Sequence, residues 1–245
     1  MGVFIRADDP LAVAAVDAIH LGNLPELRRL LAENPGLAQV RLGDTEPGGL
    51  SRTLLHVATD WPGHFPNGVE TVALLIEAGA EVNARFSGPH TETPLHWAAS
   101  SDDVAVLDVL LEAGADIEAP GAVIGGGPPL ADATAFGQWK AAHRLVERGA
   151  RTTLWDAATL GLMDRLESSL AAELPSPAEV ADAFWGACHG GQRRSAEGLL
   201  ARGADLNWLP GWERLTPLDA ARRNQFEELA EWLRSLGAKS AEELD

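Results

Sequence analysis

The sequence is short of cysteine, of basic residues and of long apolar runs. Its 245 residues include a single cysteine, Cys188, which excludes an intrachain disulfide framework and a metal site built from several cysteines. No stretch is long and apolar enough to span a bilayer, and the first ten residues, MGVFIRADDP, lack the apolar run of a signal peptide. We therefore expect a cytoplasmic protein without a membrane partner.

Basic residues are scarce relative to acidic ones. The chain has 19 Lys and Arg against 36 Asp and Glu, which gives a formal net charge of −17. Attraction to phosphate backbones or anionic lipid is therefore unfavourable, and nucleic acid is not an expected partner. Hydrophobic residues make up 46% of the chain, which is enough to build a folded core.

An alanine recurs along the chain at similar intervals. Segments that begin near residues 13, 53, 93, 128, 152, 182 and 216 have as their sixth residue Ala18, Ala58, Ala98, Ala133, Ala157, Ala187 and Ala221. These starts are 40, 40, 35, 24, 30 and 34 residues apart, which is typical of a repeat protein. We expect a single domain over residues 1–245 that contains seven units.

Each unit has the pattern of two short helices. Thr93-Pro94 and Thr216-Pro217 combine an N-cap hydroxyl with proline at the first helical position. A second amphipathic run follows, as in residues 106–111, and a recurrent Gly-Ala pair ends it. Turn-forming residues then return the chain to the next unit in an extended loop or hairpin.

Two motifs resemble those of the ankyrin repeat family. The family start, Thr-Pro-Leu-His-x-Ala, is found as Thr93-Pro94-Leu95-His96-Trp97-Ala98, and the family end, Gly-Ala-Asp-x-Asn, as Gly203-Ala204-Asp205-Leu206-Asn207. The resemblance covers about residues 13–240. It implies an all-α solenoid of stacked helix-turn-helix units with a concave face, and hydrogen-bonded structural histidines at His56 and His96. The family shares this shape but no single activity.

Three segments depart from the regular pattern. Residues 60–68 form an insertion, which we call the insertion loop, and it is expected to be either a lid over one end of the groove or a surface loop. Residues 120–127 form a glycine-rich loop that could project as a mobile finger. The short interval before residue 152 leaves no room for a hairpin.

One face of each first helix is expected to line a groove. The fifth, eighth and ninth positions of a unit share a helical face, and the resemblance implies that this face is concave. With the insertion loop, the candidate binding residues are Asp60, Trp61, His64, Phe65, Trp97, Ser101, Asp132, Phe136, Asp156 and His189. Such a lining suits a cationic or aromatic group. Alternatively, the aromatic rings fill gaps between helices and the aspartates bond to neighbouring units.

Two functions fit these residues. The first is a noncatalytic binding scaffold without a cofactor, which recognises a protein partner or a small aromatic or cationic ligand. The second is an enzyme or small-molecule binder in which the insertion loop is a lid and Asp132 or Asp156, with its pKa raised by burial, acts as acid or base. The absence of metalloprotease, phosphate-binding and nucleophile-elbow motifs favours the first function. Assembly with a second copy is a third reading.

The remaining chemistry-bearing residues have structural interpretations. Cys188 follows a small-residue position and is expected to be a buried, inert thiol. Trp155 and Trp185 are expected to fill the core. The spacing of His64, His90 and Asp60 does not require them to meet, so no metal site is expected.

Overall fold

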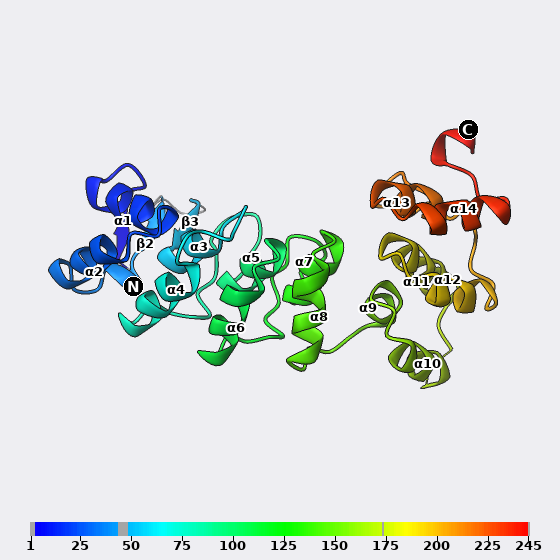
Figure 1. Ribbon diagram of the computed structural model, residues 1–245, viewed down its shortest axis with the longest axis horizontal. Helices are drawn as coiled ribbons and strands as arrows, with labels where there is room; N and C mark the ends of the chain where they lie inside the picture. Colours follow the sequence, from blue (N-terminus) through cyan, green and yellow to red (C-terminus); the bar gives the residue numbers. More distant parts are fainter. Residues whose placement is uncertain (1–2, 44–48, 173, 245) are drawn as a thin grey trace. The chain divides into compact units, whose positions relative to one another are not determined.

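The computed structural model describes residues 3–43, 49–172 and 174–244, and it contains two compact units. Unit 1 covers residues 1–150 and unit 2 covers residues 151–245 (Figure 1). The boundary between the two units falls at the short interval before residue 152, where the sequence leaves no room for a hairpin. Helices dominate the described residues, so the predicted all-α class is confirmed. The number of repeats and their union in one domain stay predictions.

Unit 1 is a stack of helix pairs with a small sheet at its N-terminal part. The helices are α1 Pro10–His20, α2 Leu24–Glu33, α3 Leu54–Thr59, α4 Gly68–Glu77, α5 Pro94–Ser100, α6 Val104–Glu112, α7 Pro129–Ala135 and α8 Trp139–Glu147, with a 3-10 turn at Leu37–Gln39. First helices pack in the order α1, α3, α5, α7, and second helices in the order α2, α4, α6, α8. Strand β2 Arg41–Gly43 pairs parallel with β1 Phe4–Ile5 and antiparallel with β3 Ser51–Thr53.

Unit 2 repeats the same arrangement. Its helices are α9 Leu154–Thr159, α10 Met163–Ala172, α11 Pro177–His189, α12 Arg193–Leu200, α13 Pro217–Arg223 and α14 Glu227–Ser235, followed by a 3-10 turn at Ala241–Glu243. Helix α11 packs between α9 and α13, and α10 packs against α12. None of the helices in the described residues of either unit has the length and apolarity that crossing a membrane requires.

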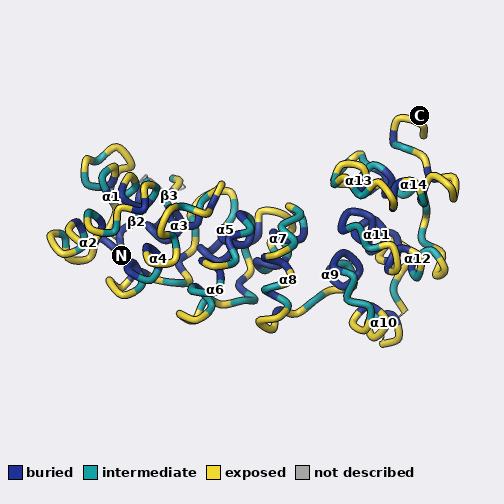
Figure 2. The backbone as a smooth tube through the Cα atoms, viewed as in Figure 1, coloured by how far each residue is buried: buried dark blue, intermediate teal, exposed yellow. Residues whose placement is uncertain are grey.

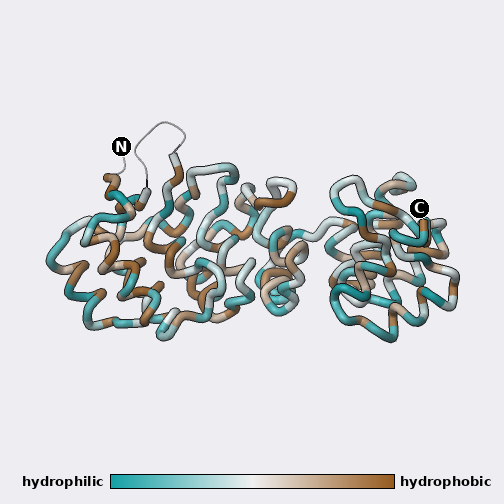
Figure 3. Tube along the Cα trace, turned by 90° about the horizontal axis from the view of Figure 1, so that it is seen from above, coloured by the Kyte–Doolittle hydropathy of each residue, from teal (hydrophilic) through white to brown (hydrophobic). Residues whose placement is uncertain are grey.

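The repeating alanines are buried where neighbouring first helices pack in each unit. All seven are at most 3% exposed, as are the leucine and phenylalanine residues Leu55, Leu95, Leu130, Phe184 and Leu218 three positions before five of them. A small side chain at this point lets neighbouring first helices approach closely. Buried backbone is concentrated where successive helices face one another (Figure 2), and hydrophobic and hydrophilic stretches alternate along each unit (Figure 3). The sixth-position alanines therefore lie on a buried face, as the sequence predicted.

Helix ends follow the predicted chemistry with three corrections. Thr93 and Thr216 cap α5 and α13, and the glycine of each Gly-Ala pair has a φ between +88° and +102°, a conformation that glycine adopts without strain. Helices α1 and α11, however, start before residues 13 and 182, because Asp9-Pro10 and Ser176-Pro177 are the real N-cap and N1 pairs. Helix α9 is capped by Thr153, one residue after the predicted start of its segment at residue 152.

Enlarging one repeating alanine should destabilise unit 1. Ala98 in α5 is 0% exposed, so Ala98→Leu overfills the contact between first helices and is expected to cost about 1–3 kcal/mol. Ala105→Leu, the same change on the exposed side of α6, is the control. Urea unfolding followed by circular dichroism measures both, and equal stability of the two variants would show that the register is wrong.

Candidate functional site

The predicted site residues are divided between the two units. Eight of them lie in unit 1, whereas Asp156 and His189 lie in unit 2. The structure describes each unit by itself, so a continuous groove that joins all ten residues stays a prediction.

The insertion loop begins with a fixed carboxylate. Asp60 follows the last residue of α3, and its side chain forms an ion pair with Arg52 of β3. The same carboxylate accepts a hydrogen bond from the backbone N–H of Trp61 at 2.9 Å. Asp60 is thus engaged within the protein and orients the residue that follows it.

The rest of the insertion loop is attached to the helix pairs on both sides. Towards α5 and α6, the backbone N–H of His64 donates to Asp103 at 2.9 Å, and Gly63 packs closely on Ser101. Towards α1 and α2, the ring of Phe65 stacks on His20 with centroids 4.6 Å apart, and Asn67 donates to the carbonyl of Gly22 at 2.9 Å. These contacts favour a fixed platform over a hinged lid.

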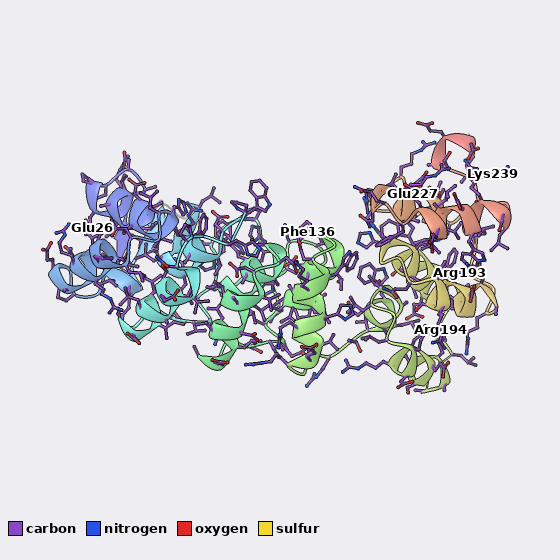
Figure 4. The ribbon with its side chains drawn as sticks, viewed as in Figure 1. Glu26, Phe136, Arg193, Arg194, Glu227 and Lys239 are labelled. Atoms are coloured by element: carbon purple, nitrogen blue, oxygen red, sulfur yellow. The ribbon has the colours of Figure 1, made fainter. Side chains whose placement is uncertain are left out.

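This platform presents a large apolar side chain to solvent. Trp61 is 78% exposed. Two further apolar residues, Leu21 and Phe136, directly follow α1 and α7 and are 73% and 46% exposed; Figure 4 labels Phe136 at the end of α7. We call Leu21, Trp61 and Phe136 the Trp61 surface. Ser101, at the matching place after α5, is buried, because Gly63 of the insertion loop lies on it.

Trp97 is half-buried and held by the residues around it. Its Nε1–H donates to Oε2 of Glu92 at 2.8 Å. Its ring meets His56 edge-on at 4.9 Å and packs on Phe86 at 5.6 Å. Trp97 therefore contributes to the packing between units and shows only part of its ring to solvent.

The carboxylate of Glu92 is a buried hydrogen-bond centre that sequence analysis missed. Glu92 is 5% exposed, and besides Trp97 it receives the backbone N–H of Val123 at 3.1 Å. Nδ1 of His90 lies 2.8 Å from its Oε2. Glu92 thereby ties the segment before α5 to the glycine-rich loop before α7. The one available signal was its place directly before the Thr93-Pro94 cap.

Asp132 is a second carboxyl group at the same centre. Its side chain is 0% exposed, and neither of its oxygens has a protein donor within hydrogen-bond geometry. Burial, followed by a hydrogen bond with Glu92 and repulsion from its charge, raises the pKa of Asp132 to about 9. Asp132 therefore carries a proton at neutral pH and donates it to Glu92, because two ionised carboxylates cannot share this site.

The glycine-rich loop carries internal hydrogen bonds. The N–H groups of Gly121 and Ala122 donate to the carbonyls of Gly126 and Gly127 at 2.9 and 3.0 Å, and Arg85 donates to the carbonyl of Pro120. Its tip exposes Val123 and Ile124 by about half. The expected mobile finger is thus a hydrogen-bonded loop fastened to Glu92.

The two predicted residues of unit 2 have local partners. Asp156 is the third residue of α9, where its Oδ2 accepts from the N–H and hydroxyl of Thr153 at 2.8 and 2.7 Å. It was expected in the groove as an acid or base, but because α9 starts one residue later it completes a capping box. His189 is buried, stacks on Trp185 at 5.2 Å, and its Nδ1 accepts from Asn224 at 2.8 Å.

The structural readings of the other histidines and of the cysteine agree with the geometry. His56 and His96 bond to the capping hydroxyls of Thr53 and Thr93 at 2.9 Å, and burial lowers their pKa values to about 3 and about 4. Cys188 is fully buried, which raises the pKa of its thiol. His64 lies beside Asp103 and His90 beside Glu92, so the described residues do not bring these two histidines together at Asp60.

Comparison with known proteins gives a family match and a relative. Residues 15–121 match the family model for ankyrin repeats in three copies. The chain is 32% identical over 175 residues to an ankyrin repeat and KH domain-containing protein of Caenorhabditis briggsae. That alignment covers 67% of this chain and 6% of the relative, so the chain spans a small part of that protein's length.

Proposed function

The chain belongs to the ankyrin repeat family, and from that premise we propose that it is a binding scaffold that takes a protein partner on the Trp61 surface of unit 1. The observation that carries the proposal is the exposure of Trp61 on an anchored loop. A tryptophan that is 78% exposed gains most of its burial energy only when a partner covers it. Because the loop is held by contacts on both sides, little conformational entropy is lost on binding.

The expected partner carries an apolar anchor. Asp60, Asp132 and Asp156 were expected to select a positive charge, yet each bonds to a neighbour within its own unit. Affinity is therefore expected from burial of Trp61 and Phe136. The net charge of −17 is expected to speed association with basic partners. A cytoplasmic location suits the single free thiol of Cys188.

The acid–base alternative has weaker support. Asp132 has the raised pKa that a general acid needs, but its carboxyl is fully buried and bonded to Glu92. A substrate would reach it only after the glycine-rich loop left Glu92. We therefore assign Asp132 and Glu92 the role of joining the loop to the stack.

Removal of one indole should weaken partner binding strongly without unfolding the protein. Peptides selected from a random phage-displayed library against the intact chain serve as probes. We expect Trp61→Ala to raise their Kd at least about tenfold and Phe136→Ala to raise it about threefold. Leu174→Ala, at an apolar residue of unit 2 that is 98% exposed, is the control. Fluorescence polarisation measures each Kd, and urea unfolding checks that each variant is folded.

Selected peptides that bind wild type, Trp61→Ala and Phe136→Ala equally would overturn the proposal. Enrichment of no binding peptide would count against it as well. Peptides that lose affinity only with Leu174→Ala would move the surface to unit 2.

A further inference from the structure

We propose that Ser176 is a phosphorylation site for a proline-directed protein kinase, which transfers the γ-phosphoryl group of ATP to the serine hydroxyl. Ser176 lies directly before α11 in unit 2, so this site does not depend on the Trp61 surface of unit 1. The observation that carries the proposal is the exposure of a Ser-Pro pair whose counterparts elsewhere in the chain are buried.

The sequence contains three hydroxyl residues that are followed by proline, namely Thr93, Ser176 and Thr216. Each is the N-cap of a first helix, and each has an extended backbone with a ψ between 158° and 169°. A proline-directed kinase selects a hydroxyl that is followed by proline, which brings no N–H that the kinase would have to satisfy. The three pairs are therefore alike in local sequence and backbone, and burial decides which hydroxyl a kinase reaches.

Burial separates the three pairs clearly. Thr93 and Thr216 are 1% and 0% exposed, and the prolines that follow them are also buried. Ser176 and Pro177 are exposed, and Leu174, two residues before the serine, is 98% exposed. A kinase contacts the residues on both sides of the hydroxyl that it modifies, so it needs an exposed and extended segment. Among the three pairs, the one at Ser176 meets this requirement.

The length of α11 explains why Ser176 is exposed. Helix α11 has 13 residues and packs between α9 and α13, which have 6 and 7 (Figure 1). Asn224, after α13, donates to the carbonyl of His189, the last residue of α11, at 2.7 Å. From this bond Thr216 is eight positions back along one helix, and Ser176 is thirteen positions back along the other. Five more helical residues carry Ser176 about 7.5 Å beyond the level of the buried cap.

The hydroxyl of Ser176 is engaged only with an exposed neighbour. Its Oγ–H donates to Oε2 of Glu179 at 2.8 Å, and its Oγ accepts the backbone N–H of Glu179 at 3.3 Å. Glu179 is exposed, so water replaces these bonds when a kinase draws the hydroxyl away. Loss of a side-chain cap shifts a helix equilibrium by about fivefold to tenfold. Phosphorylation of the folded chain should be slower than that of a free peptide by no more than this factor.

The phosphoryl transfer leaves the cap of α11 in place. Oγ of Ser176 forms a bond to the γ-phosphorus of ATP, the bond from that phosphorus to the bridging oxygen breaks, and ADP leaves. The hydroxyl proton passes to the catalytic aspartate of the kinase. The phosphate adds a charge of about −1.5 to −2 beside Leu174, and its oxygens accept the N–H of Glu179 in place of the hydroxyl oxygen. The modification thus changes the charge of an exposed apolar segment.

The test compares the intact chain with unfolded references. A purified mitogen-activated protein kinase and ATP are incubated with the intact chain and with peptides of residues 88–100, 170–182 and 211–223. Mass spectrometry locates and counts the phosphates. We expect one phosphate on the intact chain, at Ser176, with a kcat/KM within about tenfold of that for the 170–182 peptide. At Thr93 and Thr216 the intact chain should react at least about a thousandfold more slowly than the matching peptides, because the stack must open first.

Three variants test the assignment to this serine. Ser176→Ala should remove the phosphate, and Pro177→Ala should lower its rate of addition at least about tenfold. Ser240→Ala is the matched control, because Ser240 forms the same capping box with Glu243 but is followed by alanine. It should leave the rate unchanged. Circular dichroism confirms that the variants fold.

Several outcomes would overturn the proposal. An intact chain that gains no phosphate while the 170–182 peptide does would show that Ser176 is not accessible. A 170–182 peptide that the kinase does not modify would show that this segment is no substrate. Phosphate added to Ser240, Thr93 or Thr216 of the intact chain as fast as to Ser176 would contradict the roles given to proline and to exposure.

Discussion

Replacing Asp132 by asparagine is expected to remove a strong pH dependence from the stability of unit 1. In the folded protein Asp132 holds a proton up to about pH 9, because it is buried beside Glu92. In the unfolded chain the same carboxyl has its ordinary pKa of 3.8. Between these values the folded state binds one more proton than the unfolded state. Stability from this site is therefore complete below pH 3.8 and is lost as the pH rises towards 9.

The size of this effect is large for a single residue. One extra bound proton corresponds to a loss of up to about 1.4 kcal/mol for each pH unit. The amide of the substituted asparagine needs no added proton, and its N–H would donate to Glu92 in place of the carboxyl. We expect Asp132→Asn to be more stable than wild type at pH 8 and to lose little stability between pH 7 and pH 8.

The measurement is urea unfolding at pH 7.0, 7.5 and 8.0. This pH range is chosen because other titrating groups change the stability little within it. It lies above the range in which His56 and His96, with lowered pKa values, add stability as the pH rises. Asp182 in unit 2 is the control, because burial raises its pKa only to about 6. Asp182→Asn should keep the wild-type slope. If unfolding occurs in two steps, the step shifted by Ala98→Leu belongs to unit 1.

An Asp132→Asn variant with the wild-type slope would contradict the assignment of the proton to Asp132. A variant less stable than wild type at pH 8 would contradict the shared-proton arrangement with Glu92. The first result would mean that Asp132 is ionised in the folded protein.

Adding one methyl group at Gly190 is expected to destabilise unit 2 by about 3 kcal/mol or more. Gly190 follows α11, and a Cβ built there would overlap the backbone carbonyl oxygen of Thr159 at the end of α9. Its φ of −88° suits any residue, so the cost arises from the contact and not from the backbone conformation. Since the carbonyl belongs to the backbone, relief requires α9 and α11 to move apart.

Gly198→Ala in α12 is the matched control, because it makes the same chemical change inside a helix. A Cβ at Gly198 would meet only the end of the Arg202 side chain at 3.9 Å. Alanine also favours the helix, so this variant should gain about 0.5–1 kcal/mol. Urea unfolding compares the two. A Gly190→Ala variant as stable as wild type would show that α9 and α11 are not packed this closely.

The stack itself could be predicted because its signals are local and repeated. A small residue is needed wherever two first helices touch, and glycine wherever the second helix ends with a positive φ. The alanine at Ala98 and the glycine at Gly114 therefore recur in sequence with a fixed register. Longer first helices such as α11 were missed because the true cap, Ser176-Pro177, lies outside the repeating segment.

The site was harder to predict because its contacts join residues that are far apart in the chain. His64 bonds to Asp103, 39 residues away, and this pairing depends on how two units stack. Glu92 and Asp132 meet because α7 packs on α5, and the glycine-rich loop is bonded to the same Glu92. Asp156 was assigned to the groove because a one-residue change in the start of α9 converts a groove position into a cap.

The proposed binding surface requires Trp61 to stand on a fixed support, and amide hydrogen exchange in the insertion loop measures whether it does. The informative amides are those of Gly63, His64 and Gly68, which donate to Asp60, Asp103 and Phe65 at 2.7, 2.9 and 3.0 Å. We predict that these amides exchange at least about a hundredfold more slowly than in an unstructured peptide, in the free protein and without any partner. Exchange at the unstructured rate would contradict the account, because Trp61 would then lie on a mobile loop.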